Sequence, residues 1–377
     1  MSEFLSASGD AQRDPQCRAH GPARGDSHGP ARGGPHGAAS KTVGSSGCKA
    51  DELVAAARER SLKVRLVLLT VVVLSACCAY LFTSINMKFF EYAMSIRIPK
   101  LTAMVLAAIC IGGASLIFQS LINNYIVTPC LLGMNALYLV LHTLMVFLFG
   151  MGSFVITSKN LAFAADLILM GSVAVVLYNW LFVKTRYNVL YVLLIGTVMT
   201  TFFTSIQTTM VRSMDPNDYD ALLVTLVASF TSVNADVLLM SGVLMVVLTA
   251  IFYRRLKLLN VITLGRSNAI SLGVDYEGTL RWLLLYVTLM IAIATALVGP
   301  VSFMGLITTN LARQMFPTFR HNILITGTIL VTLAILIAGQ ALIERVFVYS
   351  IPVSVFITTG GGIYFLYLVL RATRRSI

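Results

Sequence analysis

The sequence predicts an all-α polytopic membrane protein, and three observations support this class. Of the 377 residues, 57% are hydrophobic and only 12% are charged, whereas soluble domains carry about a quarter charged residues. The mean hydropathy is +0.83. Apolar runs of about 20 residues, the length that crosses a bilayer as a helix, recur along the chain. Because these runs are continuous rather than alternating, they favour helices over the strands of a membrane barrel.

Residues 1–60 differ from the rest and are predicted to form a disordered tail rich in Gly, Pro and His. The stretch "AHGPARGDSHGPARGGPHGAAS" places His20, His28 and His36 in register within a repeat. Such a composition cannot bury a core. Metal binding by these histidines is an open alternative to a flexible extension. The tail lacks the short apolar segment and cleavage site of a secretory signal, and the six cysteines of the chain show no metal-ligand spacing.

Residues 61–377 are expected to form one transmembrane domain with about ten helices, the eighth of them short. The predicted spans are 64–84, 101–121, 130–149, 160–183, 189–211, 237–253, 282–299, 302–315, 322–342 and 352–370. If both termini lie inside, the cytoplasmic segments hold 16 Lys and Arg residues and the outer loops hold 6, the tail aside. Lys and Arg accumulate in cytoplasmic loops, so this orientation is favoured. The net charge of +12 then reflects the loop bias and the tail, and does not indicate nucleic-acid binding.

A semi-polar stretch, "LNVITLGRSNAISLGVDYEG", interrupts the apolar pattern from residue 259. Its glycines predict short helices broken at Gly265 and Gly273, and the charge bias puts the segment 259–280 in the cytoplasm. A plain linker is the alternative. If helical, the segment is expected to expose an apolar docking face formed by Val261, Ile262, Leu264, Ile270, Leu272 and Val274.

Four motifs in this order resemble the permeases of type II ABC importers, the iron-chelate and cobalamin uptake (FecCD-type) family. They are "RIPKLTAMVLAAICIGGASLIFQSLINNYIVTPCLLG", "LGRSNAISLGVDYEGTLRW", "GPVSFMGLITTNLAR" and "GQALIERVFVYSIPVSVFITTGGGIYFLYLVL". The match covers about residues 62–375. It implies the type II ABC importer permease fold, a location in the bacterial cytoplasmic membrane, and transport of ferric siderophore.

Three departures from the family pattern refine the resemblance. Thr309-Asn310 stands where the family has Pro-His, Asn124-Tyr125 stands for its Asn-Pro, and Lys100 replaces an Arg. These traits are most similar to the branch that handles catecholate-type siderophores. Cobalamin or haem as cargo is the first alternative.

The resemblance also implies partners, since the chain contains no Gly-rich phosphate loop and is not expected to be an enzyme. An ABC ATPase subunit would dock on residues 259–280, with Leu264, Gly265, Leu272 and Gly273 in the coupling contact. A second permease, a different homologous chain, would complete the membrane unit. An extracytoplasmic siderophore-binding protein would dock on Arg97, Lys100 and Arg345, although these side chains could instead be snorkelling anchors. No cofactor and no resident metal are expected.

The transport path is predicted along the fifth span, which is rich in small and hydroxyl residues. Thr197, Thr201 and Thr204 would line it, although such residues also serve close helix packing. The inner gate is expected at Asn124 and at Val189 and Leu190, whose apolar side chains could exclude water.

Two further alternatives depend on ionisable residues inside the spans. Asp166 is the only acidic residue deep in a predicted span, and such carboxylates are candidates for proton coupling. Without an evident basic partner, pairing with a Ser, Thr or Tyr is favoured. A secondary transporter would also need inverted repeats and paired carboxylates, and an intramembrane enzyme would need a catalytic dyad, for which His142 offers no evident partner.

Overall fold

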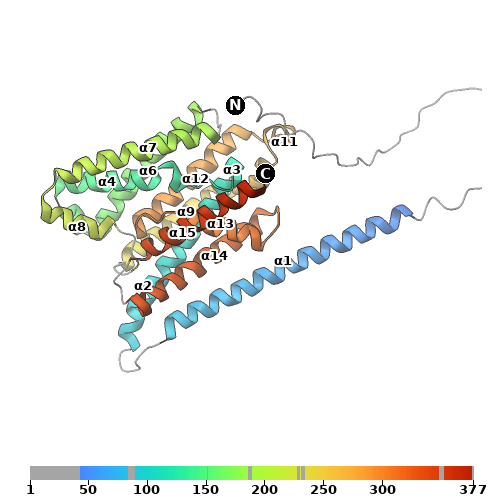
Figure 1. The fold of residues 1–377 in the computed structure, drawn as a ribbon, viewed down its shortest axis with the longest axis horizontal. Helices are drawn as coiled ribbons and strands as arrows, with labels where there is room; N and C mark the ends of the chain where they lie inside the picture. The colour runs from blue at the N-terminus through green and yellow to red at the C-terminus, as the bar shows by residue number, and fades with distance from the viewer. Residues whose placement is uncertain are drawn as a thin grey trace, which may run out of the picture. The chain divides into compact units, whose positions relative to one another are not determined.

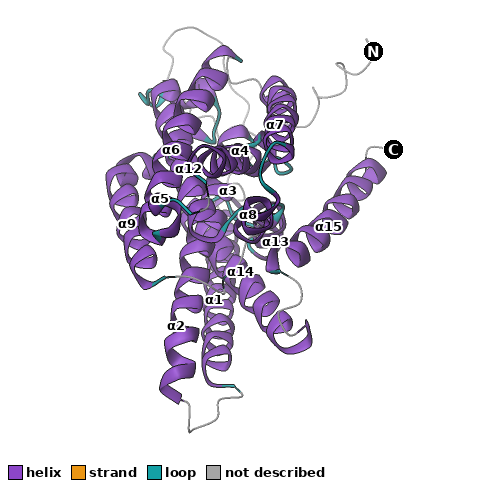
Figure 2. Ribbon diagram, turned by 90° about the vertical axis from the view of Figure 1, so that its left-hand side faces the viewer, coloured by secondary structure: helices purple, strands orange, loops and turns teal. Residues whose placement is uncertain are grey.

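Secondary structure is helical throughout the described part of the computed structural model (Figure 2). The chain divides into two units, Met1–Ala56 and Ala57–Ile377, and the second contains the candidate membrane spans. The tail histidines lie outside the described residues, which are 43–83, 90–150, 152–185, 189–226, 230, 234–347 and 352–375.

The helices of the first half alternate between long membrane-length elements and short connecting turns. In chain order they are α1 (Val43–Phe82), α2 (Phe90–Ala107), η2 (Ala108–Gly112), α3 (Gly113–Ile122), η3 (Pro129–Leu132), α4 (Met134–Phe149), α5 (Phe154–Thr157), α6 (Lys159–Lys184) and α7 (Val189–Arg212). Because α1 begins at Val43, helical structure starts earlier in the chain than the tail boundary expected at residue 60.

The second half follows the same alternation and contains the semi-polar segment as two short helices. Its elements are α8 (Pro216–Leu226), α9 (Ala235–Lys257), α10 (Leu259–Ile262), α11 (Arg266–Ser271), α12 (Tyr276–Val298), α13 (Met304–Met315), α14 (His321–Leu342), η4 (Ile343–Phe347) and α15 (Val353–Arg375).

Each of the ten predicted spans overlaps one or more helices of the described residues, although 130–149 is interrupted at Gly133 between η3 and α4. Among the described residues, 7 helical runs are long and apolar enough to cross a membrane. One of them joins α2, η2 and α3 into the 33-residue run Phe90–Ile122. The helix α4 and the part Val353–Tyr367 of α15 are apolar but shorter, and α13, the expected short span, has 12 residues.

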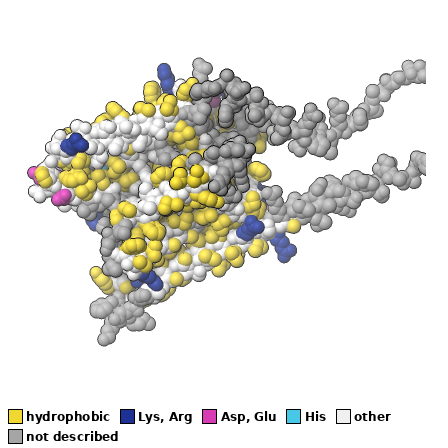
Figure 3. Space-filling model, in the orientation of Figure 1, with side chains coloured by type: hydrophobic (Ala, Val, Ile, Leu, Met, Phe, Trp, Pro, Cys, Tyr) yellow, Lys and Arg dark blue, Asp and Glu magenta, His cyan; other side chains and the backbone are white. Residues whose placement is uncertain are grey.

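The core of the Ala57–Ile377 unit is built around α12 and the α2–η2–α3 run. In these two runs, 72% and 78% of the most apolar window is buried, against 11% in α1, 17% in α7 and 22% in α9. The helices α4, α6, α7 and α8 lie together, coloured green to yellow-green, in Figure 1. The outer helices therefore leave apolar faces for lipid or for other subunits, and hydrophobic side chains cover much of the face in Figure 3.

Two glycines permit close approaches that larger residues would prevent. A Cβ atom on Gly112 would lie 2.5 Å from the Oγ1 of Thr332, so the π-helical turn η2 can pack directly on α14. A Cβ atom on Gly196 would lie 2.9 Å from Leu132 Cδ2, where α7 crosses η3. Small residues at such crossings allow helices in a membrane to pack through van der Waals contact.

Candidate functional site: coupling segment, outer cations and transport path

The segment 259–280 contains two short helices separated by glycines, as the sequence predicts. The breaks occur at Gly265 and Gly273, whose φ angles of +93° and +77° lie in the region that favours glycine. After α11, the amide of Gly273 donates to the carbonyl of Ile270, and that of Val274 donates to the carbonyl of Ala269. These turns give the segment a defined shape, which argues against a plain linker.

The coupling segment exposes apolar side chains, but fewer than expected. Leu264, Ile270 and Leu272 are 56%, 53% and 62% exposed. Ile262, which was expected on the same face, is 2% exposed. That expectation was wrong because α10 packs against α3 and α12, which turns one side of this single helical turn inward.

Specific bonds attach the coupling segment to the membrane helices. Asn260 Oδ1 accepts hydrogen bonds from the backbone amide of His321, at 3.2 Å, and from its Nδ1, at 2.7 Å. Asp275 caps α12 by accepting a bond from the amide of Gly278. A force on α10 and α11 would therefore reach α14 through the Asn260 contact, and α9 and α12 through the chain itself.

The three cations expected at the outer surface have different environments. Arg97 donates from Nη1 to three carbonyl oxygens at the end of α1, those of Tyr80, Leu81 and Thr83. Free carbonyls at a helix C-terminus attract cations, so Arg97 stabilises this end. Arg345 is exposed in η4.

Lys100 is buried, unlike a typical docking residue, and lies in a network that joins α1, α2 and α14. Its Nζ is 3.2 Å from Oε1 of Glu344. The same oxygen accepts bonds from the Tyr80 hydroxyl at 2.9 Å and from Gln340 Nε2 at 2.7 Å. Lys100 and Glu344 thus fix the turn that presents Arg345.

A groove of about 640 Å³ runs along α7 and contains Thr201 and Thr204 but not Thr197. Its lining is almost entirely hydroxyl-bearing: Thr200, Thr201, Thr204, Ser205, Thr208, Thr209, Arg212 and Ser213. The hydroxyls donate to backbone carbonyls within the helix, as from Thr204 to Thr200. Because the hydroxyl hydrogens are used within the helix, the groove offers a solute hydroxyl oxygens as weak hydrogen-bond acceptors, together with methyl groups. The side chains of Val189 and Leu190 lie outside the described residues.

Asn124 lies in a turn that several residues attach to α3 and α13. Its Oδ1 accepts a bond from the amide of Ile126. The carbonyl of the adjoining Tyr125 accepts bonds from Gln119 and Asn310, each at 3.0 Å. Arg313 CZ lies 4.6 Å from the centre of the Tyr125 ring.

Sequence reasoning did not identify this cluster as a unit, although both ends of it departed from the family pattern. Tyr125 stands in place of a proline, and Asn310 stands in place of a histidine. Their hydrogen bond shows that the two departures meet in space. The two departures from the family pattern were therefore the sequence signal from which this contact could have been inferred.

Asp166 and His142 form a buried pair between α6 and α4. His142 Nδ1 is 2.9 Å from Asp166 Oδ2, and its Nε2 is 3.3 Å from the Thr225 hydroxyl of α8. The ring of Tyr138 stacks on His142 with 5.6 Å between centroids. The expectations that Asp166 lacks a basic partner and that His142 stands alone were therefore wrong, because helix packing joins positions 24 residues apart. Among the described residues there is no group of three or more His, Cys, Asp or Glu that could hold a metal.

Relatives of known function match almost the whole transmembrane part. The petrobactin import system permease protein YclO of Bacillus subtilis is 36% identical over 301 residues, covering 80% of this chain and 96% of the relative. The petrobactin import permease FatC of Bacillus anthracis is 31% identical, covering 73% and 78%. The ferric enterobactin permease FepG of Escherichia coli is 26% identical, covering 74% and 82%.

A solved structure shares the fold. A metal-chelate type ABC transporter in an inward-facing conformation superposes with a TM-score of 0.68 at 21% identity, covering 83% of this chain and 99% of that one. The FecCD transport family model matches residues 62–371, which include the coupling segment, the outer cations and the α7 groove. The chain belongs to the FecCD transport family.

Proposed function

We propose that the chain is the membrane-spanning permease subunit of an ATP-binding cassette importer that carries ferric siderophore across the bacterial cytoplasmic membrane. The observation that carries this proposal is the coupling segment, a shaped and partly apolar surface attached to four membrane helices. Membership of a transport family and the petrobactin and enterobactin permeases among the relatives support it. The permease itself is not an enzyme, and a separate ATPase subunit supplies the energy.

In this proposal the chain spans the membrane ten times with both termini in the cytoplasm. The charge bias of the loops supports the orientation. The short helices α4 and α13, of 16 and 12 residues, then cross with help from neighbouring protein, because a helix of 12 residues is only about 18 Å long. Non-spanning helices are tolerated at membrane depth where protein or a water-filled path surrounds them.

ATP-driven closure of the ATPase would move α10 and α11 through Leu264, Gly265, Leu272 and Gly273. The Asn260–His321 contact would transmit this movement to α14, whose far end carries Glu344 and Arg345. Binding protein docked at Arg345, with Arg97 and Lys100 holding the adjacent helix ends, would thereby sense the ATPase. The inner and outer partners would be linked through one helix.

The substrate path is proposed along the hydroxyl groove of α7, with a second permease closing its other side. A different homologous chain is the proposed partner. Weak acceptors and methyl groups suit a bulky chelate that must be released after binding. Thr201 and Thr204 would contact it within the groove, and Thr197, one turn before Thr201 on α7, would extend the path beyond the groove. The turn at Asn124, together with Val189 and Leu190, would form the inner gate.

Ferric petrobactin is the first cargo to test, because two relatives are petrobactin import permeases. The full complex in proteoliposomes would be supplied with binding protein and labelled ferric petrobactin, with ferric enterobactin, cobalamin and haem as competitors. A ferric siderophore should accumulate and should be displaced only by siderophores. Accumulation of cobalamin or haem instead would replace the siderophore assignment while preserving the importer.

A further inference from the structure

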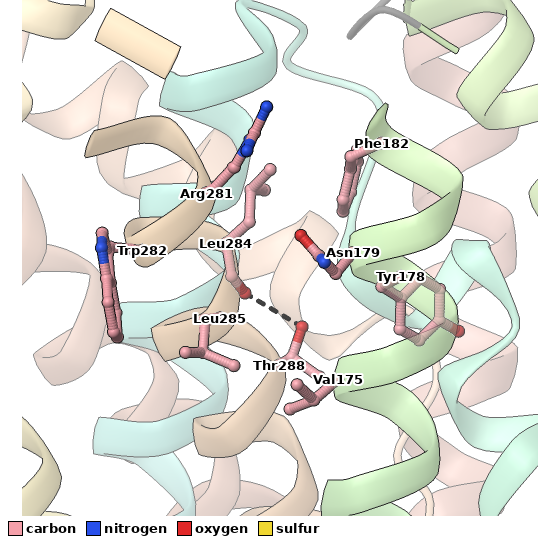
Figure 4. A pocket seen from close by; sticks show the side chains of 9 residues that line it. All are labelled: Val175, Tyr178, Asn179, Phe182, Arg281, Trp282, Leu284, Leu285 and Thr288. Carbon is pink, nitrogen blue, oxygen red and sulfur yellow. Dashed lines mark hydrogen bonds between the residues drawn. The ribbon is translucent and has the colours of Figure 1, made fainter. Parts of the chain in front are cut away.

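A second cavity, of about 340 Å³, lies between α6 and α12 and is separate from the hydroxyl groove. Its volume is at the lower end of the range for small-molecule sites, roughly 300–1,000 Å³. Figure 4 shows Arg281 and Phe182 at one end, Asn179 in the middle, and Val175 and Thr288 at the other end. The end of the cavity at Arg281, its mouth, is therefore charged, and the rest of the lining is apolar apart from Tyr178, Asn179 and Thr288.

The cavity opens on a face that the membrane would cover. On α6, the residues that directly follow the lining residues Val175, Asn179 and Phe182 are Val176, Trp180 and Val183, and they are 71%, 58% and 46% exposed. Consecutive helix positions are about 100° apart, so this apolar strip borders the cavity. In a bilayer, this strip would face acyl chains rather than water.

The polar groups of the cavity lie at different distances from its charged end at Arg281. Tyr178 donates to the carbonyl of Leu132, Thr288 donates to that of Leu284, and Arg281 also has an interaction within the protein. The side-chain amide of Asn179 makes no hydrogen bond within the described part of the chain. Trp282 is 47% exposed and packs on Phe252 of α9, with 5.8 Å between the ring centroids. The amphipathic ring of tryptophan is typical of the membrane interface.

Positive charge surrounds the mouth. Arg281 lies on the second turn of α12, and Lys184 ends α6. The last turn of α9, which packs beside α12, adds Arg254, Arg255 and Lys257. The nearest carboxylate in sequence, Glu277, is 3.1 Å from Arg266 of the coupling segment. The electrostatic field at the mouth thus favours an anion.

We infer that this cavity binds an anionic phospholipid of the cytoplasmic leaflet, with its phosphate at Arg281 and one acyl chain along Leu285 and Val175. Basic pockets between membrane helices on the cytoplasmic side are suited to such headgroups. The amide of Asn179 lies one turn deeper and would bind an ester carbonyl. The leaflet follows from the orientation proposed above. Because α12 directly follows the coupling segment, bound lipid would stabilise the position of the helix that moves when the ATPase closes.

The test measures retained lipid and needs no ATP, binding protein or siderophore, so its failure would not affect the proposed transport function. The full-length chain is placed in nanodiscs of phosphatidylcholine with phosphatidylglycerol, extracted gently, and examined by native mass spectrometry. The wild type should retain phosphatidylglycerol in preference to phosphatidylcholine. Arg281→Gln should lower that retention about fivefold, because the attraction between one basic side chain and an anionic surface accounts for a factor of that size.

Matched variants make the result specific. Arg320→Gln removes an exposed cation that precedes α14, lies outside the basic cluster and does not line the cavity, and should retain the lipid. Leu285→Trp should block the acyl chain and lower retention while Arg281 is intact. Equal retention of both lipids, or equal losses from Arg281→Gln and Arg320→Gln, would overturn the site. Displacement of the lipid by inorganic phosphate alone would show a free-anion site and would also overturn the lipid assignment.

Discussion

The buried pair of Asp166 and His142 shows how one side-chain contact can join three helices. The carboxylate binds Nδ1 of the imidazole, and the Thr225 hydroxyl lies at Nε2. Polar groups inside a membrane protein favour such pairing, because lipid offers no hydrogen-bond partner. The pair connects α4, α6 and α8, which gives Asp166 a structural role.

Asp166→Asn should destabilise the fold while leaving transport active. Interhelical polar contacts in membranes contribute about 0.5–2 kcal/mol each, so the free energy of unfolding should fall by that amount. Unfolding in mixed micelles would measure it. Ser172→Ala, which removes an exposed hydroxyl bonded within the same helix, is the control and should have little effect. Asp166→Asn combined with His142→Gln should cost less than the sum of the two single losses, since both changes weaken the same contact; fully additive losses would refute the pairing.

Arg345 and Arg97 should contribute differently to capture of the binding protein. Arg345→Glu reverses an exposed charge. Because an ion pair between Arg345 and the binding protein would be exposed, binding should weaken by roughly 1 kcal/mol or less. Arg97→Glu should weaken binding further and also lower thermal stability, because it removes three bonds to the end of α1. Surface plasmon resonance at low salt would measure affinity, with Lys159→Glu as an outer-side control. Unchanged affinity in the double variant would exclude a docking role.

At the scale of elements, the coupling segment should be the point where the ATPase binds. Leu272→Asp places a charge on an exposed apolar side chain, and Gly273→Pro is incompatible with a φ angle of +77°. Both should leave the folded permease in the membrane but reduce co-purification of the ATPase and ligand-stimulated hydrolysis. Leu272→Met keeps the apolar contact and should behave as wild type. Wild-type coupling in the Asp variant would refute the assignment.

The turn that contains Asn124 and Tyr125 should loosen when its bond to α13 is removed. Asn310→Ala deletes the donor to the Tyr125 carbonyl but leaves that of Gln119. Hydrogen–deuterium exchange of residues 123–128 should become several-fold faster, since each lost bond is worth about 1 kcal/mol. Asn322→Ala, an exposed asparagine at the start of α14, is the control. Unchanged exchange would mean that Asn310 does not hold the turn.

The sequence predicted the helices and their glycine breaks because both depend on local signals. Apolar run length identified the long apolar helices, and Gly265 and Gly273 identified the breaks on either side of α11. Contacts between distant positions could not be predicted in this way. The partners of Asp166 and Lys100 depend on how helices rotate against one another, and Ile262 became buried for the same reason. One chain gives no covariation from which such rotations could be inferred.

At the scale of the whole molecule, the proposed permease is a passive membrane part driven by an external motor. In this proposal, the apolar faces of α1, α7 and α9, the hydroxyl groove and the exposed coupling residues would contact lipid, a second permease and an ATPase. A proton-coupled secondary transporter would instead place its energy source in paired intramembrane carboxylates. The Asp166–His142 pair is the feature of this chain that such a mechanism would use.

The most direct test is uptake of labelled ferric siderophore into proteoliposomes that contain the full complex, with either ATP or an imposed pH difference as the energy source. We predict accumulation with ATP, none with the pH difference alone, and retained ATP-driven uptake in Asp166→Asn. Uptake driven by the pH difference without ATP, and abolished by Asp166→Asn, would contradict the account.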